Sequence, residues 1–326
     1  MRYLITGGGG FIGSHLADAL VTRGDGVLIL DDLSTGRRTN VEHLLEADLV
    51  EFVEGSILDP DLVDQCVASV DSVCHLASAV GVQLIVRDPL RSLITNMRGN
   101  DLVISAAARH RKQLLFTSTS EVYGKNGSGP LAEDSDRILG SAFKSRWSYA
   151  TAKALGEALA HAYFTEEGAP TVVVRLFNTV GPRQTGAYGM VLPRFVGQAL
   201  RDEDMTVYGD GTQTRCFVHV ADTVRALVQL IDEDAAIGNV YNIGSSEPVA
   251  VIQLARRVIE RTESESKIAL VPYEDAYEAG FEELGRRVPD TTALHDLTGW
   301  TPTRTLEETI DEVINYERAR AAATRA

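Results

Sequence analysis

Cysteine is scarce in this chain, which holds three in 326 residues: Cys66, Cys74 and Cys216. They are too few and too scattered for a disulfide framework or a CxxC metal site. Long apolar runs are also missing, because no stretch approaches the ~18 residues of a membrane span. No charged-then-apolar leader precedes the first apolar stretch, which begins at residue 2. We therefore expect a protein of the reducing cytoplasm, with no metal site and no membrane partner.

Positive charge is in short supply as well. Lys plus Arg number 31 and Asp plus Glu number 46, so the formal net charge is −15. This balance argues against a surface that binds nucleic acid or an anionic membrane. An anionic substrate must then be held by individually placed arginines, because a planar guanidinium can bind phosphate oxygens in pairs. The candidates are Arg183, Arg215 and Arg287.

Apolar strands alternate with helical patterns in the first half of the chain. Near-continuous apolar strands indicate a sheet that is covered on both faces, as in parallel doubly wound proteins. We predict an α/β protein with a Rossmann-type doubly wound parallel sheet and a smaller, interleaved α/β substrate-binding lobe. The expected strands are residues 2–6, 26–31, 49–54, 72–77, 112–118 and 171–177.

The pattern changes beyond Arg175, where Gly- and Pro-marked loops such as NTVGPRQTGAYG and YGDGTQT precede short helices. The helix after HVAD and the strand NVYNIG look like returns to the large sheet. We assign residues 1–177, with returns near 218–243, to the Rossmann-type domain. Residues 178–217 and 244–326 are assigned to the smaller, substrate-binding lobe.

A glycine string at the amino terminus predicts a phosphate-binding turn. In TGGGGFIGSHL, Gly7, Gly10 and Gly13 let the backbone turn sharply and approach a pyrophosphate at the start of a helix. About twenty residues later, the second strand ends in Asp31, whose carboxylate can accept hydrogen bonds from an adenosine ribose. Because this carboxylate repels a 2′-phosphate, we expect NAD rather than NADP, although two arginines follow at 37–38.

Tyr149 and Lys153 in SYATAK are spaced i and i+4, so both project from one face of a helix. A nearby ammonium favours the phenolate, and we expect it to lower the tyrosine pKa toward working pH. The spacing alone also suits two unrelated surface residues. Its position after the fifth strand of a dinucleotide-binding fold favours a catalytic base and a lysine that binds the nicotinamide ribose.

The fifth strand runs into LLFTSTSEVYG, which places hydroxyls and one carboxyl group at its carboxyl end, where α/β sheets bind ligands. The hydroxyls of Thr117, Ser118, Thr119 and Ser120 can hydrogen-bond a sugar oxygen, or they can simply cap a turn. Glu121 can relay a proton or orient a water molecule, or it can be an ordinary surface glutamate.

Taken together, the motifs resemble the extended short-chain dehydrogenase/reductases that act on nucleotide sugars. The resemblance covers nearly the whole chain through TGGGGFIG, DDLSTG, HLAS, STSEVYG, YATAK, RLFNTVGPRQ, YGDGTQTRCFVHVAD and RRVPD. Within that family, STSEVYG followed by SRWSYATAK is most similar to the UDP-glucuronate decarboxylases, also called UDP-xylose synthases. The resemblance implies an NAD-dependent enzyme that binds a UDP-sugar and pairs as a homodimer.

The resemblance also implies roles for single residues. Thr119 would position the sugar, Glu121 would aid decarboxylation, and Tyr149 would be the base with Lys153 as its partner. Arg287 would meet the phosphates or act near the reacting sugar. The cofactor-binding candidates are Gly7, Gly10, Phe11, Ile12, Gly13, Asp31, Ile57, Leu76, Ala77, Ser78, Tyr149 and Lys153. The substrate-binding candidates are Asn178, Arg183, Tyr208, Arg215 and Arg287.

Two departures from the family pattern leave the reaction open. An acidic residue usually precedes Ile57, and here Ser56 stands there, so the adenine contact is expected from the backbone or from Asp59. The loop GPRQTGAYGMVLPRF is nearer to some 4-epimerases than to many decarboxylases.

We predict decarboxylation of UDP-glucuronate through a 4-keto intermediate to UDP-4-ketopentose, UDP-xylose or both, because Glu121 and Arg287 suit controlled protonation at C5. The alternative is 4-epimerisation of UDP-glucuronate or a UDP-hexose. A non-catalytic NAD-binding sensor is a third hypothesis, but such proteins usually lose the tyrosine or the lysine, and this chain keeps both.

Overall fold

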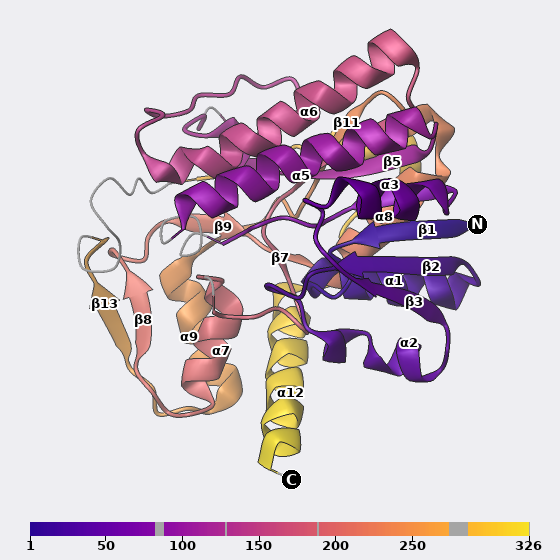
Figure 1. Ribbon diagram of the computed structural model, residues 1–326. Helices are drawn as coiled ribbons and strands as arrows, with labels where there is room; N and C mark the ends of the chain where they lie inside the picture. The colour runs from indigo at the N-terminus through magenta and orange to yellow at the C-terminus, as the bar shows by residue number, and fades with distance from the viewer. Residues whose placement is uncertain (82–87, 128, 188, 274–285, 326) are drawn as a thin grey trace.

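The computed structural model describes residues 1–326 except 82–87, 128, 188, 274–285 and 326. Its centre is a seven-stranded sheet in the order β11-β6-β5-β4-β1-β2-β3, in which every neighbouring pair is parallel (Figure 1). This confirms the predicted Rossmann-type sheet. The strands are β1 (Arg2–Thr6), β2 (Gly26–Asp31), β3 (Val50–Glu54), β4 (Ser72–His75), β5 (Gln113–Thr119), β6 (Thr171–Leu176) and β11 (Val240–Ile243).

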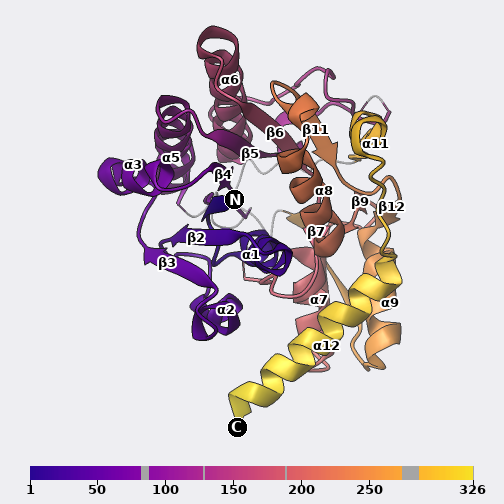
Figure 2. The same cartoon turned by 90° about the vertical axis from the view of Figure 1, so that its right-hand side faces the viewer.

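Helices cover both faces of this sheet, because alternate residues of each strand point to opposite sides. Tyr3 and Ile5 of β1 pack in the core beneath α1 and α8, whereas Leu4 packs in a second core beneath α3, α5 and α6. Figure 2 shows these two groups of helices on opposite sides of the sheet. Their bounds are α1 (Phe11–Arg23), α3 (Pro60–Ala68), α5 (Pro89–Arg109), α6 (Ser148–Glu167) and α8 (Val220–Asp232), with the short α2 (Glu42–Glu46) beside β3.

A smaller group of elements lies below the sheet in Figure 1 and has a core of its own. Here β8 (Met205–Tyr208) pairs with β13 (Ile268–Val271), and α7 (Val191–Ala199) packs against α9 (Val251–Thr262). The chain returns to the large sheet through α8 and β11, as the sequence suggested, while the exact domain boundaries stay a prediction. The remaining strands are two pairs, β7 (Thr179–Val180) with β10 (Val218–His219) and β9 (Thr214–Cys216) with β12 (Pro248–Ala250).

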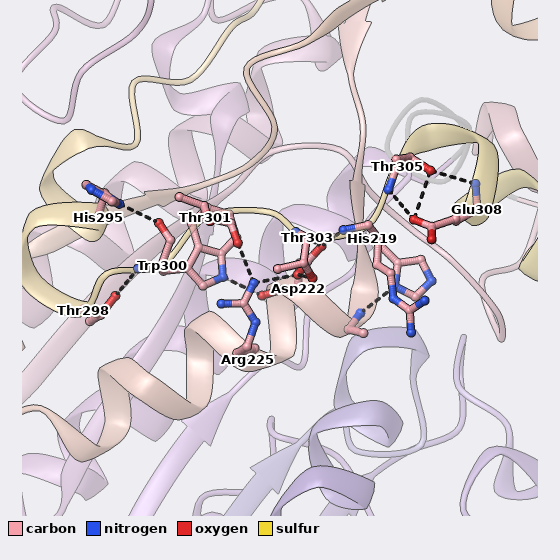
Figure 3. Close-up of polar contacts among 12 residues, drawn as sticks. His219, Asp222, Arg225, His295, Thr298, Trp300, Thr301, Thr303, Thr305 and Glu308 are labelled. Atoms are coloured by element: carbon pink, nitrogen blue, oxygen red, sulfur yellow. Dashed lines mark hydrogen bonds and ion pairs between the residues drawn. The ribbon is translucent and has the colours of Figure 1, made fainter.

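A buried carboxylate fastens the carboxyl-terminal segment to α8. Asp222 accepts hydrogen bonds from the Thr303 and Arg304 amides at 2.9 and 3.0 Å and from the Thr303 hydroxyl at 2.7 Å (Figure 3). Trp300 is fully buried and donates its ring N–H to the Asp222 carbonyl at 2.9 Å. Asp222 thereby connects α11 (Thr292–Thr298) and α12 (Leu306–Arg325) to the main body.

Within the described residues, no helix is both long enough and apolar enough to cross a membrane, and no group of three or more His, Cys, Asp or Glu side chains could hold a metal ion. The three cysteines are free and buried.

Candidate active site

A cavity of about 540 Å³ opens along the carboxyl ends of the sheet strands and extends to the smaller lobe. It lies beside β1, which has β2 on one side and β4 on the other. The strand order reverses at this point, and doubly wound sheets bind their ligands there. Apart from Asp59, every cofactor-binding, catalytic and substrate-binding residue expected from the sequence lines this cavity. Asp59 instead caps α3, where it accepts a hydrogen bond from the Leu62 amide at 3.1 Å. The structure therefore brings the rest of the set together, while the role of each residue stays a prediction.

The glycines form a backbone cradle at the start of α1. Gly7 has a φ of +73°, which favours glycine, and a Cβ added to Gly13 would lie 2.2 Å from the Gly7 carbonyl oxygen. No side chain caps the amino end of α1, where Gly10 stands at the cap position. The free N–H groups and the positive end of the helix dipole thus suit a pyrophosphate, so these residues fit a dinucleotide.

Asp31 lies at the end of β2 beside this cradle. Its carboxylate accepts hydrogen bonds from the amides of Gly9 and Leu33, both at 2.8 Å. Burial raises the pKa of Asp31, and these two bonds oppose that effect. The remaining acceptor positions suit the hydroxyls of a ribose. Arg37 also lines the cavity and is a cation that would favour a 2′-phosphate.

Tyr149 and Lys153 lie in the first turns of α6, and both side chains are buried in the cavity wall. Burial raises the pKa of Tyr149 to about 12 and Glu121 adds to the rise, while hydrogen bonds with Ser78 and Thr119 oppose it. Burial also lowers the pKa of Lys153 to about 7. The predicted lowering of the tyrosine pKa by Lys153 is therefore wrong for this structure.

The physical reason is where the lysine points. The Lys153 Nζ donates to the Thr117 carbonyl at 2.9 Å, so its ammonium is held at the end of β5. The loss of water around the phenol then dominates the tyrosine pKa. A further positive charge beside the phenol would favour the phenolate and lower this pKa.

Glu121 lies between two guanidiniums in the same cavity. Its Oε1 accepts from the Nη1 of Arg287 at 2.7 Å, and its Oε2 lies 2.5 Å from the Nη1 of Arg146. Both arginines are about 95 % buried. Burial favours the neutral acid, but the charges of Arg287 and Arg146 outweigh it and lower the pKa of Glu121 to about 2.

This arrangement favours one of the roles considered for Glu121. At neutral pH it is an ionised carboxylate that accepts hydrogen bonds, and it carries no proton to relay. A surface location is also wrong, because the side chain is only 15 % exposed. Sequence reasoning missed Arg146, although it stands three residues before Tyr149 in SRWSYATAK, close to one helical turn away.

The far end of the cavity is formed by the smaller lobe. The Asn178 side chain donates to the Cys216 carbonyl at 3.1 Å, and Tyr208 lies beneath the guanidinium of Arg194 at 4.3 Å. Arg215 lies on β9 in this wall. Arg183 also lines the cavity, but its Nη1 lies 2.7 Å from Asp18 of α1. A phosphate would therefore have to compete with the Asp18 carboxylate for the Arg183 guanidinium.

Comparison with known proteins agrees with this geometry. The model of the NAD dependent epimerase/dehydratase family matches residues 3–244. A UDP-N-acetyl-alpha-D-glucosaminuronate decarboxylase of Bacillus cytotoxicus is 42% identical over 318 residues, which cover 97% of this chain and 98% of that protein. UDP-glucuronic acid decarboxylase 1 of Xenopus tropicalis is 34% identical over 97% of this chain and 72% of its own length.

Among solved structures, the UDP-glucuronic acid 4-epimerase of Bacillus cereus in complex with UDP-glucuronic acid and NAD has a TM-score of 0.86 and 27% identity. The match covers 98% of this chain and 100% of that one.

Proposed function

The chain belongs to the NAD dependent epimerase/dehydratase family, and we propose that it decarboxylates a UDP-linked uronate sugar with NAD as its cofactor. The observation that carries this proposal is the ionised Glu121 held between Arg146 and Arg287 in the cavity that contains Tyr149. The two guanidiniums can stabilise the negative charge of the substrate carboxylate. They can also stabilise the enolate that forms when carbon dioxide leaves. The decarboxylases among the relatives support the same reaction.

Two uronates are the substrates to test. UDP-glucuronate is the one expected from the sequence motifs, and relatives at 32–35% identity are named for it. The relative at 42% identity is named for the N-acetylated sugar, which favours the 2-acetamido form as the second candidate. Both sugars carry the C6 carboxylate on which the chemistry depends.

Tyr149 is the proposed general base for the first step. It accepts the proton of the 4-hydroxyl, with Thr119 as a second hydrogen-bonding group beside it. When bound, NAD supplies the hydride acceptor for oxidation at C4 and, in its oxidised form, a positive charge that favours a phenolate. Lys153 lines the same cavity wall, and we assign to it a hydrogen bond with the nicotinamide ribose.

The new ketone at C4 makes the sugar a β-keto acid. The C5–C6 bond breaks, carbon dioxide leaves, and the electron pair of that bond passes into an enolate with its negative charge on the C4 oxygen. We assign stabilisation of this charge to the guanidiniums of Arg146 and Arg287, and we assign their orientation to Glu121. A proton taken up at C5 from solvent water then gives UDP-4-ketopentose; were the reduced cofactor to give its hydride back to C4, the product from UDP-glucuronate would be UDP-xylose.

The alternative is 4-epimerisation, in which the 4-ketosugar turns over before the hydride returns and no carbon is lost. It is favoured by solved neighbours that are named 4-epimerases, and it uses the same base and cofactor site. The non-catalytic sensor is disfavoured, because Tyr149 and Lys153 are both present and both line the cavity.

Product masses decide among these functions. We expect incubation of the NAD-loaded protein with UDP-glucuronate, and separately with its 2-acetamido form, to give a product lighter by one carbon dioxide. An isomer of unchanged mass would instead identify a 4-epimerase. We expect the parent protein to be active and the Tyr149→Phe variant to be inactive. This result would exclude the hypothesis of a non-catalytic NAD-binding sensor.

We also propose a cytoplasmic homodimer. Supporting this, α5 and α6 pack side by side at the surface and carry exposed apolar side chains, Leu90 and Met97 on α5 and Leu155 on α6 (Figure 1). Light scattering that returns the mass of one chain would overturn the dimer.

A further inference from the structure

We propose that Arg194 binds the diphosphate of the substrate, a role that rests on the UDP-sugar function proposed above. Arg194 is the fourth residue of α7 and lines the cavity at its far end, together with Tyr208 and Arg215. Its guanidinium lies 4.3 Å from the centre of the Tyr208 ring and 5.4 Å from that of Phe195. Both rings lie within cation–π distance of the guanidinium.

The hydrogen bonds of Arg194 leave donors available. Nη2 donates to the Thr206 carbonyl at 3.1 Å. Nε and Nη1 are buried, and neither has a hydrogen-bond partner within the described part of the chain. A buried N–H without an acceptor costs free energy, so these two donors indicate an acceptor that the bound ligand supplies.

Three other cavity arginines differ from Arg194 in having a carboxylate partner, although Arg183 and Arg287 also each have one buried donor without a hydrogen-bond partner within the described residues. Arg146 and Arg287 are both paired with Glu121, and Arg183 is paired with Asp18. For Arg194 no described carboxylate lies within ion-pair distance. In a chain of net charge −15, a cavity-lining cation without such a carboxylate attracts a dianion.

Charge favours the diphosphate over the uracil carbonyl groups as the ligand atoms. A guanidinium binds phosphate oxygens through charge-assisted hydrogen bonds, which are about twice as strong as bonds between neutral groups. The position of Arg194 in VLPRFVGQA also explains why the sequence did not reveal it, because there it is indistinguishable from a polar residue on an amphipathic helix.

The experiment measures binding without turnover. Calorimetry on the NAD-loaded protein would give the dissociation constants of UDP, UMP and uridine for the wild type and for Arg194→Met, Arg194→Lys and Arg201→Met. Arg201 is the matched control, because it lies seven residues further on and forms an exposed ion pair with Glu203. We expect Arg194→Met to weaken UDP binding about 10- to 100-fold and uridine binding less than about 3-fold.

The lysine variant should retain part of the UDP affinity, and the Arg201 variant should bind like the wild type. Unchanged NAD affinity and melting temperature of Arg194→Met would show that the fold is intact. An unchanged UDP dissociation constant in that variant would overturn the proposal, as would equal losses for UDP and uridine, which would place Arg194 at the base. A wild type that does not bind UDP would reject the proposed UDP-sugar function itself.

Discussion

Replacement of Glu121 by Gln is the most informative perturbation of the site. Glutamine keeps the size of the side chain but removes the charge that Arg146 and Arg287 share. The pKa of Glu121 falls from an ordinary 4.5 to about 2, which corresponds to about 3 kcal/mol of favourable interaction in the ionised form. We therefore expect the variant to lose about 3 kcal/mol of interaction that holds the two guanidiniums in place.

The consequence for catalysis differs between the two chemical steps. Oxidation at C4 depends on Tyr149 and should slow less than about threefold, whereas carbon dioxide release should slow about 100-fold, the rate equivalent of about 3 kcal/mol. Single-turnover experiments with UDP-glucuronate would follow the nicotinamide absorbance and the released carbon dioxide in parallel. Equal losses in both rates would refute the separate role of Glu121, and no loss in either would show that the charged group is only structural.

The same pKa predicts the effect of acid on this variant. Because the pKa of Glu121 is lower in the folded protein than in the unfolded chain, its contribution to stability is present above about pH 4.5 and is lost as pH falls toward 2. Urea denaturation at several pH values should show this loss in the wild type, and a smaller loss in Glu121→Gln. An identical pH dependence in the two proteins would contradict the charge assignment.

Four further predictions follow from the structure. Tyr149→Phe should lower the rate of NAD reduction by at least about 100-fold, measured in the same single-turnover assay, and a smaller effect would mean that another group is the base. After removal of the cofactor, activity should recover faster with NAD than with NADP because of Asp31, and the reverse result would assign the site to NADP. Arg215→Ala should raise the UDP dissociation constant by about 10-fold or more, and an unchanged value would leave Arg215 as a wall residue without a binding role. Asp222→Asn should lower the free energy of unfolding, measured in urea at pH 7, by about 3 kcal/mol. Burial raises the pKa of Asp222, but hydrogen bonds from Arg225 and Thr303 outweigh burial and lower it in the folded protein. The wild type should therefore lose stability in acid, and the variant should lose less. An unchanged unfolding midpoint would contradict that assignment.

Much of the fold and the cofactor site could be predicted from the sequence, because the signals are local. The near-continuous apolar strands predicted a sheet covered on both faces, and the observed strands begin and end within two residues of the expected ones. The positive φ of Gly7 and the crowding at Gly13 are properties of the glycine string itself. The spacing of Tyr149 and Lys153 likewise placed both on one face of α6. Family resemblance carried the reaction class, which the relatives bear out.

Tertiary structure decided what depends on residues far apart in the chain. Glu121 meets Arg287 across 166 positions, and this contact makes it an ionised anchor instead of a proton donor. The tyrosine pKa rises instead of falling because burial dominates it, while Lys153 donates to the Thr117 carbonyl. Arg183 forms an ion pair with Asp18, and two buried donors of Arg194 have no hydrogen-bond partner within the described residues. Backbone preference and side-chain period can be read along a sequence, whereas desolvation and charge pairing depend on which distant residues the fold brings together.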